Sequence, residues 1–203
     1  MKKNFKTGLQ VVAVSLLASL IATFSSYASV DYSYMPEEIE KYSDVYVLDE
    51  NEYVMKEKEY GLDAYSTYGF HLTDRTSRIY VANFYGESIK DSTIVHECAH
   101  RMFEQCWMEL FEVSNPGEKS RMQRILEKKS KDWDFLFDNN YMGGSSYDMS
   151  QYHTEIFARV YEEYYSYWIR HDRDKLIEQG FLDMEIVQIY DEIEQAFIEK
   201  TKN

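Results

Sequence analysis

Apolar residues recur every three or four positions in two long stretches of the chain, which is the spacing of an amphipathic helix. The first stretch follows Asp91 and Ser92, either of which can cap a helix that we expect to run to about Phe111. Its apolar stripe consists of Ile94, Val95, Cys98, Ala99, Met102, Cys106 and Leu110. Residues 183–199 repeat the pattern. The sequence therefore predicts two amphipathic helices, each with one face in a core.

Strand patterns are confined to the part of the chain before residue 85. Residues 44–48 alternate and include β-branched side chains, and residues 67–72 and 78–84 flank the polar segment 73–77 in the manner of an antiparallel hairpin. Residues 51–64 are charged and fit neither period, so their structure stays open. We expect a small, mostly antiparallel sheet packed on the helix that follows it.

Most of the remaining chain is helical in pattern. Pro36, followed by acidic residues, is typical of a helix start, and residues 138–146 are rich in turn formers. The other expected helices cover residues 118–133, a stretch from Gln151 or His153 to Ile169, and a short segment ended by Gly180. The fold class is therefore α+β, with a mainly helical C-terminal half.

The first 28 residues resemble a signal peptide. Three lysines at positions 2, 3 and 6 precede an apolar run over residues 11–24, and small residues lead to a cleavage point after Ala28. The run is shorter than the roughly 20 residues that a membrane-spanning helix needs. We expect a secreted, extracellular protein whose residues 29–203 form one monomeric domain without a membrane segment.

Charge and composition narrow the possible functions. The 203 residues include 22 Lys and Arg against 36 Asp and Glu, giving a net charge of -14. Nucleic acids and anionic lipids are bound largely through basic residues, so we expect no nucleic-acid partner. A hydrophobic content of 44% predicts a folded chain. Cys98 and Cys106 lie eight residues apart on one predicted helix, about 12 Å, which is too far for a disulfide; we expect both to be buried.

The motif that carries chemistry is His96-Glu97-Cys98-Ala99-His100 on the first amphipathic helix. Residues four apart stack on one helix face, so the two imidazoles can converge on one Zn²⁺. Glu97 would then lie beside the open coordination position, where a carboxylate can act as general base toward water. We expect one catalytic zinc ion held by His96 and His100.

A catalytic zinc takes a third protein ligand, and spacing leaves two carboxylates to consider. Cys106 occupies the place of the third His in a longer motif, but the glycine turn which that motif needs is Phe103 here. Glu118 has a suitable separation but directly follows Pro116 and Gly117, at the very start of the helix expected there. Glu155 lies in a predicted helix and is the better candidate, with Glu118 second.

The two segments together resemble a known family. His96 to His100, followed about 55 residues later by Glu155-Ile156-Phe157-Ala158-Arg159-Val160-Tyr161, is similar to the catalytic domain of anthrax lethal factor and to the secreted Pro-Pro endopeptidases. The resemblance covers about residues 36–199, and its specific part is these two motifs. It implies a zincin-like fold, a secreted zinc metalloendopeptidase acting on a peptide or protein substrate, and Glu155 as third ligand.

The chain departs from this family at two positions. A family tyrosine that stabilises the oxyanion lies seven residues before the third ligand, where this chain has Asp148. Tyr147, one residue earlier, is our candidate for that role, and Tyr152 is the reserve. Arg159 stands where the family has glutamate, and no effect on the metal is assigned to it. Cleavage between prolines, which belongs to one branch of the family, is not expected of this chain on the strength of the resemblance.

The expected activity is peptide hydrolysis by zinc-activated water, with Glu97 as base and Tyr147 as oxyanion donor. By the resemblance, residues 78–84 would present a free strand edge to an extended peptide. His153 is expected to be peripheral, His71 and His171 receive no role, and the aromatic stripe after Tyr161 is read as core. The alternatives are a zinc-binding but inactive effector or adhesion module, and an interaction protein with a coincidental motif.

Overall fold

A computed structural model describes residues 11–13, 35–65, 67–72, 78–133, 149–170, 178 and 183–202, and side chains over most of these ranges. Several expectations fall outside the described residues. They concern the hairpin turn, the loop over residues 138–146, Tyr147, His171, Gly180 and the cleavage point after Ala28. The described ranges nevertheless include both motifs singled out by the sequence.

The sheet is mixed, and its strand order is β1-β3-β4-β2. Strands β3 (Gly69–Leu72) and β4 (Ile79–Ala82) form the predicted antiparallel hairpin, with Phe70 opposite Tyr80. Strand β2 (Val45–Leu48) pairs parallel to β4, and β1 (Val11–Ala13) pairs antiparallel to β3. Because β4 has a partner on each side, the expectation of a free edge at residues 78–84 is wrong.

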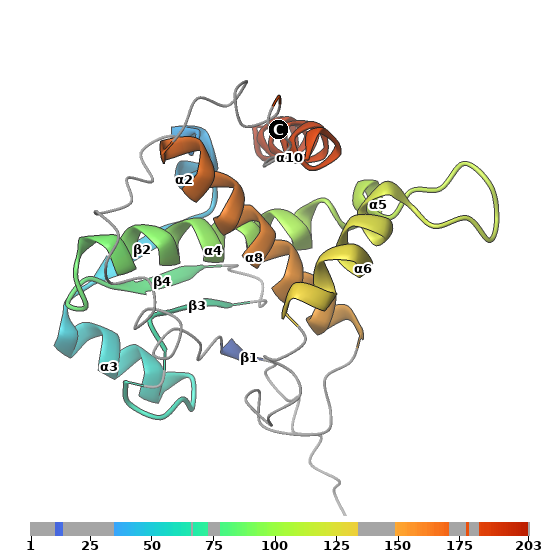
Figure 1. Cartoon of the computed structure of the whole chain (residues 1–203). Helices are drawn as coiled ribbons and strands as arrows, with labels where there is room; N and C mark the ends of the chain where they lie inside the picture. Colours follow the sequence, from blue (N-terminus) through green and yellow to red (C-terminus); the bar gives the residue numbers. More distant parts are fainter. Residues whose placement is uncertain are drawn as a thin grey trace, which may run out of the picture.

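The two faces of the sheet carry different layers, as Figure 1 shows. On one face, α3 (Glu50–Glu59) covers an aromatic cluster of Tyr53, Phe70, Leu72, Tyr80 and Ala82. The opposite face carries the long helix α4. Helix α3 lies in the segment left open by the sequence, and a reciprocal capping box between Asp49 and Glu52 begins it.

Helix α4 (Glu87–Gln105) begins four residues before the predicted cap at Asp91. Gly86 occupies the N-cap position with φ 108°, a conformation that glycine adopts readily. The hydroxyls of Ser92 and Thr93 donate to the carbonyl oxygen of Ile89 inside the helix. The predicted continuous helix to Phe111 is also interrupted, at Cys106, and a short helix α5 (Trp107–Leu110) follows.

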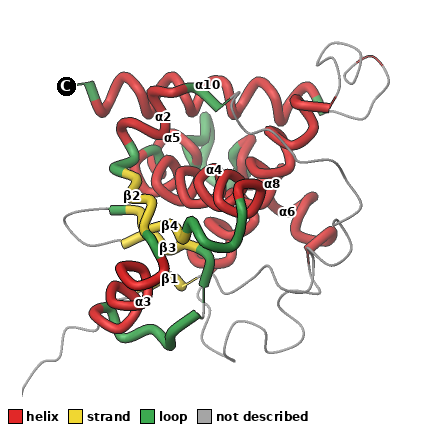
Figure 2. The backbone as a smooth tube through the Cα atoms, turned by 90° about the vertical axis from the view of Figure 1, so that its left-hand side faces the viewer, coloured by secondary structure: helices red, strands yellow, loops and turns green. Residues whose placement is uncertain are grey.

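A layer of helices packs on the side of α4 that faces away from the sheet (Figure 2). Its members are α2 (Glu37–Tyr42), α6 (Arg121–Trp133), α8 (Met149–Arg170) and α10 (Met184–Thr201). Tyr161, Tyr164 and Tyr165 of α8 are buried in the main core, which confirms the core interpretation of the described part of the stripe. Cys98 and Cys106 are buried and free, as expected. The α+β class with a mainly helical C-terminal half is confirmed.

A helix that crosses a membrane needs about 20 predominantly apolar residues. Among the helices that the structure describes, none combines sufficient length with sufficient apolar character to span a bilayer. The apolar run of the predicted signal peptide lies mostly outside the described residues.

Candidate metal centre

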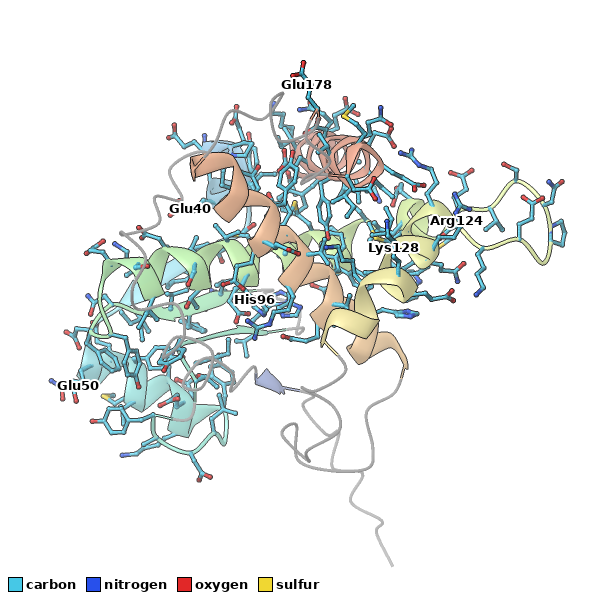
Figure 3. The ribbon with its side chains drawn as sticks, in the orientation of Figure 1. Glu40, Glu50, His96, Arg124, Lys128 and Glu178 are labelled. Carbon is cyan, nitrogen blue, oxygen red and sulfur yellow. The ribbon has the colours of Figure 1, made fainter. Side chains whose placement is uncertain are left out.

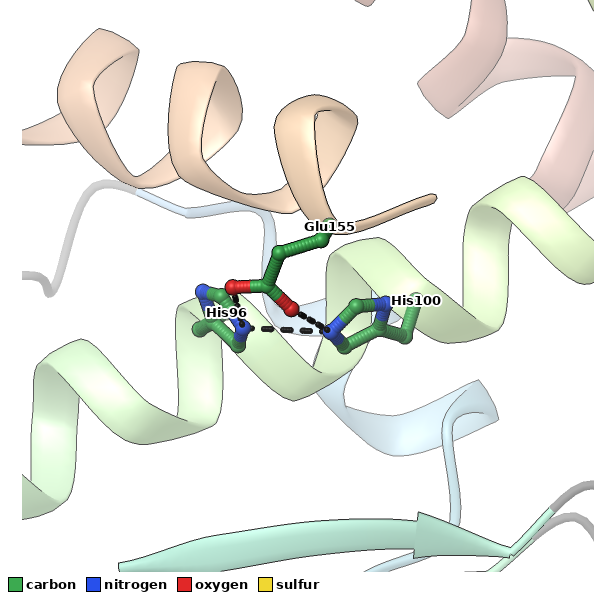
Figure 4. Close-up of side chains that lie close together, drawn as sticks. All are labelled: His96, His100 and Glu155. Carbon is green, nitrogen blue, oxygen red and sulfur yellow. Dashed lines mark hydrogen bonds and ion pairs between the residues drawn. The ribbon is translucent and has the colours of Figure 1, made fainter. Parts of the chain in front are cut away.

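Helices α4 and α8 lie side by side and bring three side chains to one point, labelled in Figure 4. The Nε2 atoms of His96 and His100 are 3.1 Å apart. The two carboxylate oxygens of Glu155 lie 3.6 Å from Nε2 of His96 and 3.5 Å from Nε2 of His100. Within the described ranges, this is the group of three residues whose ligand atoms could hold a metal ion.

The chemistry of these donors fits a zinc site. Two imidazole nitrogens and one carboxylate oxygen are a usual ligand set for catalytic zinc. All three side chains are almost completely buried, and Oε2 of Glu155 has no hydrogen-bond partner. Burying a carboxylate oxygen without a partner is costly, and a coordinated cation would remove that cost. The three side chains could therefore hold a metal ion.

The surroundings of His96, His100 and Glu155 shift the pKa of each side chain. Burial alone would lower the pKa of His96, but the negative charge of Glu155 and hydrogen bonding to carboxylates more than offset it and raise the pKa. Burial would raise the pKa of Glu155, yet His96 and Arg159 hold it well below its usual range. Burial lowers the pKa of His100, reinforced by the charge of His96. Glu155 is thus an anion, ready to accept a cation.

Each histidine is also held from its far side. Nδ1 of His100 lies 2.9 Å from the hydroxyl of Thr154, and Nδ1 of His96 lies 3.4 Å from Oε2 of Glu162. The hydroxyl contact fixes the ring of His100 and leaves its Nε2 for a metal, whereas Nδ1 of His96 lies near the Glu162 carboxylate without a hydrogen bond. Thr154 and Glu162 were missed from the sequence. The available signal was position: Thr154 precedes Glu155, and Glu162 follows it by two helical turns.

Thr154→Val is expected to weaken zinc binding about tenfold, because Nδ1 of His100 loses its hydroxyl partner while the shape of the side chain is kept. Zinc affinity measured by competition with a chromophoric chelator checks this. Thr154→Ser keeps the hydroxyl and should bind zinc as the native protein does. Equal affinity in all three proteins would show that Thr154 does not orient His100.

Glu97 follows His96 on α4, interacts electrostatically with His96 and Glu155, and has its Cγ on the side of α4 that faces Gly69 of β3. It is 1% exposed, and Oε2 has no hydrogen-bond partner. Burial raises the pKa of Glu97 to about 7. A carboxylate with a pKa near neutrality can both accept and return a proton at that pH, as a general base must.

The backbone of β3 approaches Glu97 closely at Gly69. A Cβ at this position would clash with the Cγ2 methyl of Thr93 and lie 3.3 Å from Cγ of Glu97 and 3.2 Å from the carbonyl oxygen of Tyr80. Glycine is therefore required for the strand to pack against the helix at the site.

Gly69→Ala is expected to destabilise the protein by about 1–3 kcal/mol, because the added methyl overpacks the contact between β3 and α4. Chemical denaturation measures the change. Combining it with Thr93→Ser removes the clashing methyl while keeping the hydroxyl that donates to Ile89, so part of the stability should return. An undiminished loss in the double variant would locate the strain elsewhere.

The other residues considered from the sequence lie apart from this group. Glu118 is exposed and accepts a hydrogen bond from Asn115, and Cys106 lies in the core. His153 stacks on Phe111 at a ring distance of 6.0 Å and is not a member of the ligand group. His71 is buried on β3, with Nε2 3.5 Å from Oε2 of Glu104.

The oxyanion donor proposed from the sequence is not placed. Tyr147 lies outside the described residues, and Tyr152 belongs to α8 in a part whose side chains are not described. Figure 3 shows His96 between the ribbons of α4 and α8. The described part of the site therefore consists of three side chains that could hold a metal ion, the buried carboxylate of Glu97 and the residues that contact them.

Comparisons of the chain with models of protein families, with curated proteins and with solved structures gave no match. The resemblance to the lethal factor and Pro-Pro endopeptidase group thus rests on the two sequence motifs alone.

Proposed function

We propose that the protein is a secreted zinc-dependent endopeptidase of zincin-like fold. One observation carries the proposal: the side chains of His96, His100 and Glu155 converge in a buried group, and the unpartnered carboxylate of Glu97 lies next to them. The general base distinguishes this arrangement from a structural metal site, which has no use for a buried carboxylate of raised pKa.

The roles follow from the chemistry of each residue. When bound, zinc supplies a Lewis acid that polarises the scissile carbonyl and acidifies water. Glu97 accepts the proton of the attacking water and delivers it to the leaving amine. His96, His100 and Glu155 hold the metal, and their burial limits the access of bulk water. Tyr147, with Tyr152 in reserve, remains our proposal for the donor to the oxyanion.

The substrate is proposed to bind as an added strand at β3. The outer edge of β3 pairs with β1, whose residues lie inside the predicted signal peptide. Cleavage after Ala28 would remove β1 and leave that edge open to an extended peptide. Because Gly69 of β3 packs against Glu97, a peptide on this edge would run along the strand nearest the general base.

The test is zinc content together with cleavage of a mixed peptide library by the purified exported protein. One zinc per chain, cleavage abolished by a chelator and cleavage restored by zinc are the expected results. Zinc without cleavage would favour the inactive effector or adhesion module instead. Absence of zinc would overturn the proposal, and the mass of the exported chain would show whether cleavage follows Ala28.

A further inference from the structure

A buried arginine contacts the proposed metal ligand. Arg159, one turn after Glu155 in α8, is 3% exposed, and its Nε donates to Oε1 of Glu155 over 3.0 Å. Its Nη1 lies 3.4 Å from Oε2 of Glu162, the same oxygen that lies 3.4 Å from Nδ1 of His96. The four side chains thus form a closed loop of contacts in which the guanidinium of Arg159 lies against the ligand carboxylate of Glu155.

Arg159 and Glu162 should change the affinity of the site for a cation in opposite directions. Glu162 places negative charge 3.4 Å from Nδ1 of His96, on the far side of that ring, and this charge favours a bound cation. Arg159 is permanently charged. It neutralises Glu155 before a metal arrives and repels a divalent cation afterwards. Both effects of Arg159 oppose metal binding.

From this geometry we infer that Arg159 and Glu162 set the metal affinity of the site in opposite directions: Glu162 strengthens it, and Arg159 weakens it while keeping Glu155 paired in the metal-free protein. Both are positioning residues and neither is a metal ligand. The consequence is a site that is assembled before metal binds and that releases metal more readily than the same ligands would without Arg159. This inference rests on the metal-binding part of the proposed function.

The first test is zinc affinity at fixed pH, measured by competition with a chromophoric chelator. Glu162→Gln is expected to weaken binding about 10- to 100-fold. Arg159→Met, which keeps bulk but removes charge, is expected to tighten it about tenfold. Arg159→Lys keeps the charge and should stay within about threefold of the native value. Weaker binding in Arg159→Met, or equal effects of Met and Lys, would overturn the inference.

A matched control is available one residue further along α8. Glu163 pairs with Lys129 at 3.3 Å rather than with the metal group. Glu163→Gln removes the same charge from the same helix and should leave zinc affinity unchanged. Cobalt substitution adds a spectroscopic control, since an unchanged absorption spectrum in the Arg159 variants shows that the ligand set is the same.

The second test needs no metal. In a chelator, Arg159→Met should lower the Tm by about 10 °C, because the buried Glu155 carboxylate loses one of the two side chains, Arg159 and His96, that offset its burial. Adding Glu155→Gln removes that charge, so the double variant should melt above Arg159→Met alone. A double variant no more stable than the single one would exclude the counter-ion role, even if Arg159→Met folds poorly.

The outcomes separate this inference from the peptidase proposal. A native protein that binds zinc and shows the opposite affinity shifts, yet cleaves no peptide, would retain the inference and reject the peptidase. A protein that cleaves peptides but shows no affinity shifts would retain the peptidase proposal and reject the inference. A native protein that binds no zinc would reject both.

Discussion

Glu97→Gln is expected to lower the rate of peptide hydrolysis by about 10²- to 10⁴-fold while leaving the zinc content at the native level. Glutamine has nearly the shape of glutamate but cannot accept the proton of the attacking water. Glu97 is not a member of the ligand group, so metal binding should persist. Initial rates on the best peptide of the library, with zinc measured on the same samples, check both parts.

The same substitution should not destabilise the protein. Burial raises the pKa of Glu97 to about 7, which means that the folded state disfavours the ionised carboxylate. This cost to the free energy of unfolding is absent below the pKa that Glu97 has in the unfolded chain. It is complete above the pKa that Glu97 has in the folded protein, where it reaches about 3 kcal/mol. Glu97→Gln removes the ionisation, so we expect an equal or higher Tm above pH 7.

Glu97→Ala is the matched comparison, because it also stops proton transfer but leaves a cavity and should lower the Tm. Cleavage by Glu97→Gln at near-native rates would show that another group is the base. Loss of zinc in that variant would instead give Glu97 a structural role in the site.

Periodicity predicted α4, because its long apolar stripe faces the core, whereas α8 was expected as the helix that follows the turn-rich residues 138–146. Helix α8 was predicted to begin within a few residues of its observed start, and α4 was placed well enough to carry the His96 and His100 pair. Helix α3 was not predicted, because its charged residues hide the apolar positions. Its capping box of Asp49 and Glu52 was the usable signal.

Strand order could not be predicted in the same way. The hairpin of β3 and β4 is local, so its turn and apolar runs are enough to predict it. The parallel pairing of β2 with β4 joins segments about 34 residues apart across α3, and nothing in residues 45–48 indicates which neighbour they take. The free edge was therefore assigned to the wrong strand.

At the site, the sequence predicted the candidate metal ligands better than the residues that contact them. His96, His100 and Glu155 follow from motif spacing and the family resemblance. The contact of Glu162 with His96 depends on which face of α8 turns toward α4, which core packing decides. Arg159 departs from the family pattern, and its ion pair with Glu155 is an i,i+4 contact within α8, so its spacing was an available signal.

Glu155→Gln is expected to weaken zinc binding more than about 100-fold, exceeding the effect of the outer residues, and to reduce cleavage to background. It removes the anionic ligand while keeping the side-chain volume. Chelator competition measures the affinity. Glu118→Gln is the control, because Glu118 is the other carboxylate with suitable sequence spacing but is exposed and bonded to Asn115; its zinc affinity should equal the native value.

The stability of Glu155→Gln provides a second readout, and it should change in the direction opposite to that expected for Glu97→Gln. Removing the charge of Glu155 leaves the buried Arg159 without its 3.0 Å partner, and breaking a buried pair by removing one member costs several kcal/mol. Because Glu162 still faces Arg159, we expect a loss near the lower end, roughly 3 kcal/mol, in the metal-free protein. Two neighbouring buried carboxylates should therefore respond oppositely to the same substitution, since one is paired and the other is not. Equal stability changes at Glu97 and Glu155 would contradict the assignment of one as base and the other as ligand.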